Sequence, residues 1–316
     1  MLHALHTCFA ESEIHWVVAR GFHEILEDHP LIRKLWVIDK NSWKKPARAF
    51  DTFEDLRRLW SGLRRERFDL VVDLQGLFRS AMIGIFTGTG ERVGFDSARE
   101  GAKYTYKYRI TTDPEMHAVE KNMVLARALG CGAGDPVFSF PPLDPAPELS
   151  RLLPVEYAVI APSAGTLVKR WPAANFGYLA SNLPVPAVIV GGRSDMALAD
   201  EIYALSGGRA VSLAGKTSLK ELAAVIRRAK FLVTADSGPM HIAAALNVPV
   251  LAVFGPTSPA RTGPYGKMHT IIRSDLPCSP CYRRKPCEDW KCMSGITAES
   301  VLNVIMTKMF SHTPRL

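Results

Sequence analysis

The sequence has no long run of apolar residues and no other mark of a membrane or secreted protein. No stretch approaches the roughly 20 apolar residues that a membrane-spanning helix needs. The first residues, MLHALHTCFAESE, contain no basic region before an apolar core. We therefore expect no signal peptide and a cytoplasmic location.

The signatures of two other function classes are also missing. No G-x-G-x-x-G motif follows a first strand, which disfavours a dinucleotide-dependent dehydrogenase. No basic stretch is interleaved with aromatic residues, so we expect no nucleic-acid partner.

The composition is that of a globular protein with a large core. Of the 316 residues, 47% are hydrophobic and 22% are charged, and this length fits two domains of ordinary size. The net charge of +8 is compatible with an anionic substrate or an anionic membrane face. A solvated surface is the alternative, because the Lys and Arg residues are mostly scattered.

Strand and helix patterns alternate in the first half of the chain. Apolar runs predict strands at 14–18, 34–38, 70–72 and 92–95. Helices are predicted at 22–27, 52–66, 77–86 and 117–129. The polar stretch 96–108 has no clear period, so we expect a loop there. Proline is frequent in residues 132–154, which makes this segment the best domain boundary.

The second half repeats the alternation. Strands are predicted at 157–161, 187–190, 210–213, 231–235 and 248–254, with helices between them and a last helix at 298–310. Such alternation predicts parallel sheets joined by right-handed crossovers. We expect an α/β protein of two Rossmann-like, doubly wound domains, 1–140 and 150–316, which face a cleft.

The most informative stretch begins at Phe231. The apolar run to Ala235 is followed by Asp-Ser-Gly-Pro at 236–239 and then by a helix. A small-residue loop between a strand end and a helix start binds anions, through free N–H groups and the helix dipole. A second such loop, 255–258, ends the next strand. Two loops on one sheet edge indicate a diphosphate ligand; an ordinary β-α-β connection is the alternative.

Four of the six cysteines lie in one short segment. They follow the spacing C-x2-C-x5-C-x4-C: Cys278, Cys281, Cys287 and Cys292. Four thiolates this close can hold a tetrahedral zinc ion, and C-x2-C is the usual first half of such a site. The second half is less regular than in zinc ribbons. Reduced structural thiols are the favoured interpretation, a structural zinc site is the alternative, and a catalytic metal is not expected.

Several motifs together resemble the heptosyltransferases of lipopolysaccharide assembly. They are DLQGLFRS (73–80), GFDSAREG (94–101), HAVEKN (117–122), KRWP (169–172), DSGPMHIAAAL (236–246), FGPT (254–257) and RTGPYG (261–266). Their order and separation match that family over nearly the whole chain. DLQG and SARE resemble the heptosyltransferase I type, which adds the first heptose to Kdo-lipid A.

The resemblance implies a GT-B fold with an acceptor-binding N-terminal domain and a nucleotide-sugar-binding C-terminal domain, the latter carrying the Cys-rich turn. It implies inverting transfer of heptose from ADP-L-glycero-D-manno-heptose to the Kdo-lipid A inner core, without a required cofactor. The positive net charge then fits an enzyme that is peripheral to the anionic cytoplasmic face of the inner membrane. A family member that uses another sugar is an alternative.

The donor-binding residues implied by the family motifs belong to the second half of the chain. They are Lys169, Asp195, Asp236, Ser237, Gly238, Pro239, Met240, His241 and Thr257. Pro239 has no N–H and would shape the loop. The alternatives are a solvated Lys169-Arg170 pair, an N-cap role for Asp195, and a loop-capping role for Thr257.

The acceptor-binding residues implied by the resemblance belong to the first half. They are Arg79, Arg99, Lys103 and His117. The three cations would bind Kdo carboxylates and lipid A phosphates, although each alone could be a solvated charge. His117 could contact the acceptor or simply begin its helix.

The catalytic base is the point at which the sequence departs from the family pattern. Family members begin with a strand that ends in Gly-Asp, and this Asp is taken as the base. Here Met1 falls within the helix that follows, so the N-terminal domain is expected to lack its first strand and the catalytic residue is unassigned. Asp73 is a weak substitute, since an N-cap role is favoured. A catalytically impaired nucleotide-sugar-binding relative is therefore the alternative to an active transferase.

Overall fold

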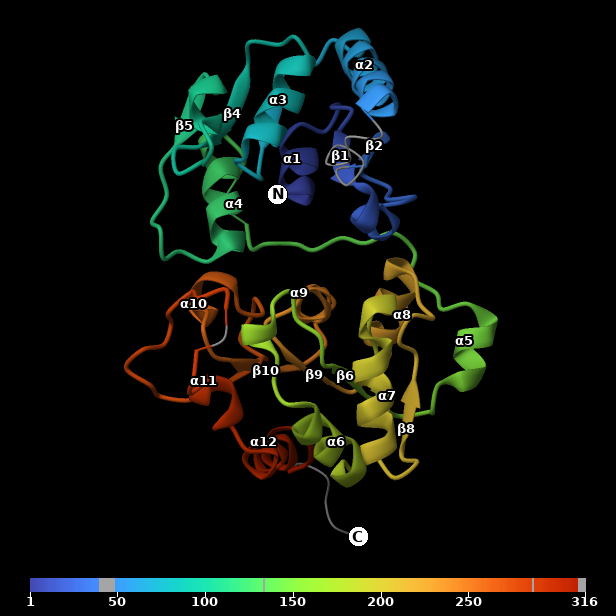
Figure 1. The fold of residues 1–316 in the computed structure, drawn as a ribbon. Helices are drawn as coiled ribbons and strands as arrows, with labels where there is room; N and C mark the ends of the chain where they lie inside the picture. The colour runs from blue at the N-terminus through green and yellow to red at the C-terminus, as the bar shows by residue number, and fades with distance from the viewer. Residues whose placement is uncertain (40–48, 133, 286, 312–316) are drawn as a thin grey trace. The chain divides into compact units, whose positions relative to one another are not determined.

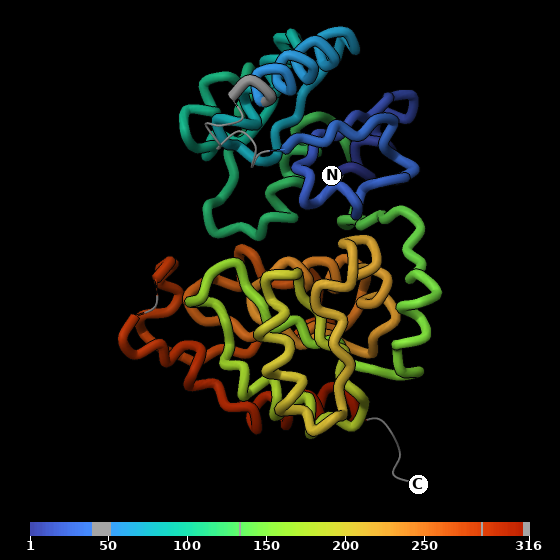
Figure 2. The backbone as a smooth tube through the Cα atoms, turned by 45° about the vertical axis from the view of Figure 1, so that its right-hand side comes forward, coloured from blue at the N-terminus to red at the C-terminus, as the bar shows by residue number. Residues whose placement is uncertain are grey.

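The computed structural model describes residues 1–39, 49–132, 134–285 and 287–311 (Figure 1). The chain divides into two compact units, Met1–Pro141 and Pro142–Leu316, here called unit 1 and unit 2. The division falls inside the proline-rich segment, which the backbone trace shows in green (Figure 2). All strand pairs assigned in the two units are parallel, as the alternating sequence pattern predicted.

Unit 1 combines short parallel strands with helices. The strands are β1 (His15–Ala19), β2 (Lys34–Ile38), β3 (Val71–Asp73), β4 (Arg92–Phe95) and β5 (Tyr108–Ile110). The helices are α1 (Leu2–Cys8), α2 (Ala49–Arg65), α3 (Phe78–Phe86) and α4 (Ala118–Ala128). Within the described residues, β1 pairs with β2 in one sheet, and β3, β4 and β5 form a second.

Two segments of unit 1 differ from the sequence-based expectation. The helix expected at 22–27 is a 3-10 helix, η1 (Arg20–Ile25), without buried residues. The expected loop 96–108 contains another 3-10 helix, η4 (Ala102–Thr105), and leads directly into β5. Strand β5 lies at the sheet edge with two of its three residues exposed. It therefore lacks the apolar run by which a buried strand is recognised.

Unit 2 is built on one larger sheet. Its described strands are β6 (Ala158–Ala161), β7 (Ala187–Ile189), β8 (Ala210–Ser212), β9 (Leu232–Ala235), β10 (Val250–Phe254) and β11 (Thr270–Arg273). They lie in the order β11-β10-β9-β6-β7-β8. The helices are α5 (Pro147–Leu152), α6 (Ala173–Asn182), α7 (Met196–Leu205), α8 (Leu219–Arg227), α9 (Gly238–Ala245), α10 (Pro259–Thr262), α11 (Lys291–Ser294) and α12 (Ala298–Ile305). A single π turn (Met306–Phe310) continues α12.

Helices cover both faces of this sheet (Figure 1). Successive strand residues alternate between two cores, so Ile160 packs with α6, α7 and α12, whereas Val159 packs with α8 and α9. Strands that are buried on both faces need continuous apolar runs, and this explains why β6, β9 and β10 were readable from the sequence. Edge strand β11 is only partly buried, and α5 begins with Pro147 inside the proline-rich segment, so neither was expected.

None of the described helices is long and apolar enough to cross a membrane.

Candidate functional site

The strand order of unit 2 locates a ligand position before any side chain is considered. The chain builds β6, β7 and β8 outward in one direction, and then returns to place β9, β10 and β11 on the other side of β6. In a doubly wound sheet, ligands bind beyond the carboxyl ends of the strands at such a reversal. The loops that follow β6 and β9 therefore meet at the expected site.

Helix α9 begins directly at this position. Ser237 is its N-cap residue, but no side chain caps the helix. The first N–H groups of a helix have no partner within the helix, so the amides of Gly238 and Met240 are oriented for a ligand, whereas Pro239 has no N–H to offer. Among the described residues outside its own helix turn, none has an atom within 4 Å of a Cβ added to Gly238. The positive end of the helix dipole points the same way, and the arrangement suits a phosphate.

Three of the predicted donor-binding residues meet at one carboxylate oxygen. The Lys169 Nζ donates to Asp236 Oδ2 at 2.7 Å, and the Thr257 hydroxyl donates to the same oxygen at 2.7 Å. The side chains of Lys169 and Asp236 are 27% and 9% exposed. Lys169 follows β6, Asp236 follows β9 and Thr257 follows β10, so the network joins three strand ends.

The other predicted residues of this loop have distinct environments. The Met240 side chain is fully buried in the core, so only its amide can serve a ligand. The Ser237 and Thr234 hydroxyl groups are hydrogen-bonded to each other at 2.8 Å. His241 is exposed on the first turn of α9.

Asp195 stabilises the turn between β7 and α7. It is the N-cap residue of α7, but its side chain makes no cap hydrogen bond. Instead, its carboxylate accepts from the Gly192 N–H at 2.9 Å and lies 4.0 Å from the Arg170 guanidinium. Sequence reasoning treated Arg170 only as part of a basic pair. The structure shows that adjacent residues Lys169 and Arg170 reach two different acidic side chains at this edge of the sheet.

The segments that carry the predicted acceptor cations lie close together in unit 1, near the start of α3. Arg79 lies in the first turn of α3, and the Arg99 N–H donates to the Gly76 carbonyl at 2.8 Å. Lys103 lies in η4, with its Nζ 5.5 Å from the centroid of the exposed Tyr104 ring. The loop from 96 to 101 therefore lies against the turn that precedes α3.

Glu100 is a neighbour that sequence reasoning missed. Its carboxylate accepts from the Phe78 N–H at 3.2 Å and so occupies the start of α3. Glu100 has a positive φ of 56°, which few non-glycine residues adopt. Glu100 therefore places a negative charge near the three predicted acceptor cations, and this charge would repel an anionic acceptor that binds there.

Asp73 is held in a structural role. Its carboxylate accepts from the Gln75 and Gly76 N–H groups, and the Tyr106 hydroxyl donates to it at 2.7 Å. Burial, followed by the Asp73 hydrogen bond and charge, raises the pKa of Tyr106 above its ordinary value. Because both carboxylate oxygens are engaged, Asp73 is a poor proton acceptor for a substrate. It closes the turn before α3 but does not cap that helix, whose N-cap residue is Leu77.

His117 takes the position that its alternative interpretation predicted. It is the N-cap residue of α4, and its Nδ1 accepts from the Val119 N–H at 3.2 Å.

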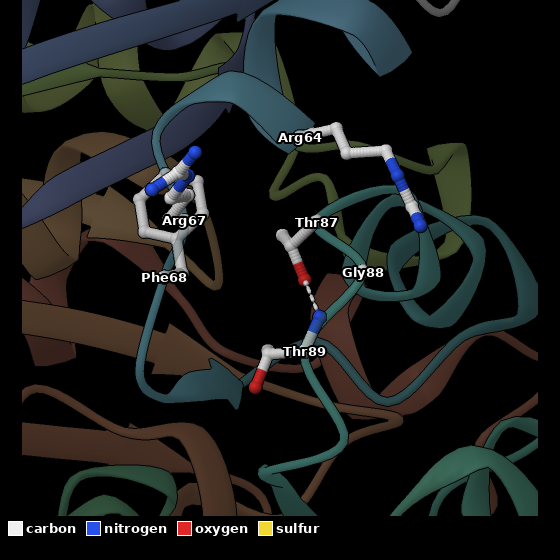
Figure 3. A pocket seen from close by; sticks show the side chains of 6 residues that line it. All are labelled: Arg64, Arg67, Phe68, Thr87, Gly88 and Thr89. Atoms are coloured by element: carbon white, nitrogen blue, oxygen red, sulfur yellow. Dashed lines mark hydrogen bonds between the residues drawn. The ribbon is translucent and has the colours of Figure 1, made fainter.

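Unit 1 also contains a surface pocket of about 290 Å³ that none of the predicted site residues line (Figure 3). Arg64, Arg67, Phe68, Thr87, Gly88 and Thr89 line it. The pocket lies where α2 and α3 end, and basic residues near helix carboxyl ends stabilise the exposed carbonyl groups there. This accounts for Arg64 and Arg67 without a ligand.

In unit 2, the network around Asp236 and the start of α9 lie together at the carboxyl edge of a doubly wound sheet, the position where folds of this kind bind their ligands. The profile of glycosyltransferase family 9 (heptosyltransferase) matches residues 56–291. The chain belongs to this family.

Known relatives are similar over most of their length. The chain is 32% identical over 278 residues to lipopolysaccharide heptosyltransferase 1 of Pseudomonas aeruginosa, which covers 85% of this chain and 77% of the relative. It is similar to the structure of E. coli heptosyltransferase WaaC with ADP, with a TM-score of 0.77 and 25% identity over 97% of this chain and 93% of that one. A second WaaC structure, with ADP-2-deoxy-2-fluoro heptose, gives a TM-score of 0.74 over 97% and 95% of the two chains at the same identity. The predicted GT-B fold and family are confirmed.

Proposed function

We propose that this chain transfers heptose from ADP-L-glycero-D-manno-heptose to the Kdo-lipid A inner core of lipopolysaccharide. The observation that carries the proposal is the meeting of Lys169, Asp236 and Thr257 at the reversal point of the sheet, beside the open start of α9. Family membership and the heptosyltransferase 1 relative support the choice of sugar and acceptor.

In the proposed reaction, an acceptor hydroxyl attacks the anomeric carbon of heptose, and its proton is released to solvent. The bond from this carbon to the β-phosphate oxygen breaks, and ADP leaves with inversion at the sugar. Negative charge builds up on the departing diphosphate. In this proposal, the Lys169 ammonium and the amides of Gly238 and Met240 stabilise this charge. We infer that these groups supply the stabilisation without a required metal cofactor.

The acceptor is proposed to bind on unit 1 through the surface formed by Arg79, Arg99 and Lys103. Carboxylates of Kdo and phosphates of lipid A are the anions that guanidinium groups bind best. We place the protein in the cytoplasm, peripheral to the anionic inner membrane. The exposed rings of Phe78 and Tyr104 beside these cations, 56% and 75% exposed, support this location, since aromatic rings favour the membrane interface.

A transfer assay with purified ADP-heptose and Kdo-lipid A tests the proposal. Mass spectrometry should detect an acceptor with one added heptose, and ADP should accumulate in equal amount without added divalent cation. Binding of ADP without any transfer would contradict the transferase proposal and favour a nucleotide-sugar-binding protein. If the protein does not bind ADP at all, the proposed donor site is contradicted as well.

The acceptor surface has a test of its own. Arg99→Ala should raise the KM for Kdo-lipid A, with a loss of about 1 kcal/mol for one partly exposed charged contact, or roughly fivefold. The Kd for ADP should stay unchanged. Arg109→Ala is the matched control, because Arg109 is an exposed residue of the same unit. Equal effects of the two substitutions would contradict a specific acceptor role for Arg99.

Membrane association is tested by sedimentation with vesicles. The protein should bind vesicles that contain phosphatidylglycerol and dissociate from them at high salt. It should not bind vesicles of phosphatidylcholine alone. Equal binding to both would contradict an electrostatic contribution.

A further inference from the structure

The segment between β11 and α11 contains more exposed cysteine than a globular surface normally shows. Cys278, Cys281 and Cys287 are exposed, whereas Cys292 is buried at the start of α11. Within the described residues, the segment 274–290 has no helix or strand, and Figure 2 draws 274–285 in orange-red, next to the grey part of the trace. Unpaired cysteine is among the most buried residue types, so burial as small apolar side chains does not explain these three thiols.

Two hydrogen bonds hold this segment against the end of β10. The Ser279 hydroxyl donates to the Gly255 carbonyl at 2.6 Å, and the Tyr282 N–H donates to the Pro256 carbonyl at 2.8 Å. The C-x2-C pair brackets Ser279 and is therefore held beside Gly255. Cys292 lies close to the same glycine, since a Cβ added to Gly255 would be 3.0 Å from its Sγ. Ser279, which lies inside the C-x2-C pair, and Cys292 are therefore both near Gly255.

The local charge also suits a cluster of thiolates. Four thiolates around a divalent ion carry a net charge of about −2. Basic residues surround the cysteines in sequence: Arg283, Arg284, Lys285 and Lys291. Arg273 at the end of β11 donates to the Ser279 carbonyl at 3.4 Å. These cations would offset the charge of the site.

We propose that Cys278, Cys281, Cys287 and Cys292 bind one zinc ion as a structural site with four thiolate ligands. Tetrahedral sulfur coordination selects zinc or iron among the common ions, and a closed four-ligand shell is structural rather than catalytic. Within the described parts of the chain, no three potential ligands are already grouped closely enough for one ion. Binding therefore has to draw the three exposed thiols onto Cys292, and it couples the metal to the folding of this segment.

A zinc ion here would also stiffen the loop that supplies Thr257. The two hydrogen bonds from the cysteine segment end on Gly255 and Pro256, directly before Thr257, whose hydroxyl donates to Asp236. The effect on ADP binding rests on the proposed function, whereas the metal content does not.

Metal analysis of the full chain, purified without a histidine tag or chelator, tests the proposal. The expected result is about one zinc per chain. Cys281→Ser should lower this to below a tenth, and because Cys281 is exposed, its substitution should leave the fold intact by circular dichroism. Cys8→Ser, in α1, is the matched control and should retain the zinc.

Release experiments add a readout that does not depend on a variant. Titration of the native protein with a mercurial should free the zinc as four thiols react, and a thiol reagent should modify these cysteines much faster after zinc removal. Less than a tenth of an equivalent of zinc, with none taken up when the reduced protein is given Zn²⁺, would overturn the site. A stoichiometric amount of iron would overturn its assignment to zinc. If the protein binds zinc but does not bind ADP, the proposed function is contradicted, whereas the proposed zinc site is supported.

Discussion

The pairing of Lys169 with Asp236 leads to two predictions of opposite sign for ADP binding. The Lys169 ammonium is held at 2.7 Å by the carboxylate of Asp236, whose side chain is only 9% exposed. A bound diphosphate would have to share this cation with Asp236. Removing the cation should weaken ADP binding, whereas removing the competing carboxylate should strengthen it.

The magnitude follows from the contacts that change. A hydrogen bond between charged groups contributes about 1.5–3 kcal/mol. Lys169 keeps part of its interaction with Asp236, so the lower end applies, and Lys169→Met should raise the Kd for ADP roughly tenfold. The same substitution removes the ammonium group beside the buried Asp236 carboxylate, which keeps its hydrogen bond from the Thr257 hydroxyl. The free energy of unfolding should therefore fall by about 1–3 kcal/mol.

Asp236→Asn retains a side chain of the same shape that can still accept from the Thr257 hydroxyl. It removes one negative charge beside the diphosphate and leaves the Lys169 charge available to it. The Kd for ADP should fall a few-fold, and the gain should shrink as salt is added. The free energy of unfolding should change by no more than about 1 kcal/mol.

Isothermal titration calorimetry measures both Kd values, and urea unfolding followed by circular dichroism measures the stability. Lys230→Met is the control, because Lys230 precedes β9 at the opposite edge of the same sheet and pairs with Glu156 at 2.9 Å. It should leave ADP binding within twofold. The argument is refuted if Lys169→Met binds ADP as the native chain does. It is also refuted if Asp236→Asn weakens binding as much as Lys169→Met.

Two further predictions concern the stability of unit 2, measured by urea unfolding. Gly255→Ala should lower the free energy of unfolding by about 1–3 kcal/mol, since the added Cβ would lie 2.5 Å from the Met293 sulfur. Gly165→Ala is the control and should change the free energy of unfolding little, because among the described residues its added Cβ has no neighbour within 4 Å. Burial raises the pKa of Tyr157 to about 12, so its contribution to stability is full below pH 10 and is lost as the pH rises from 10 toward 12. Tyr157→Phe should therefore reduce the slope of the free energy of unfolding against pH in this range by up to about 1.4 kcal/mol per pH unit. If the slope is the same in the variant and the native chain, the pKa of Tyr157 is not raised by burial.

The donor site was more readable from the sequence than the acceptor site, for a physical reason. Asp236 and Thr257 directly follow strands buried on both faces, and such strands are marked by continuous apolar runs. Once the strands are known, parallel topology brings their carboxyl ends to one edge. The motif could not show that Lys169 and Thr257 share one carboxylate oxygen, because that depends on side-chain directions in three separate loops.

The acceptor surface depends on contacts that leave no periodic signal. The polar segment around Arg99 was predicted as a loop, yet its backbone donates to Gly76 and its Glu100 side chain occupies the start of α3. Neither contact follows from hydrophobic pattern. The N-cap role favoured for Asp73 was wrong, because Leu77 is the N-cap residue of α3. The turn that Asp73 closes and its hydrogen bond from Tyr106 could be found only in the packed structure.

The separation of the two predicted sites into different units permits a last prediction. Lys169 is fixed by contacts within unit 2, and Arg99 by contacts within unit 1. Substitutions that share no partner have additive effects on free energy within about 0.5 kcal/mol. The double variant Lys169→Met/Arg99→Ala should therefore bind ADP with the Kd of Lys169→Met alone, within about twofold, by calorimetry. A markedly weaker Kd in the double variant would mean that Arg99 belongs to the donor site, and the division of labour between the units would have to be abandoned.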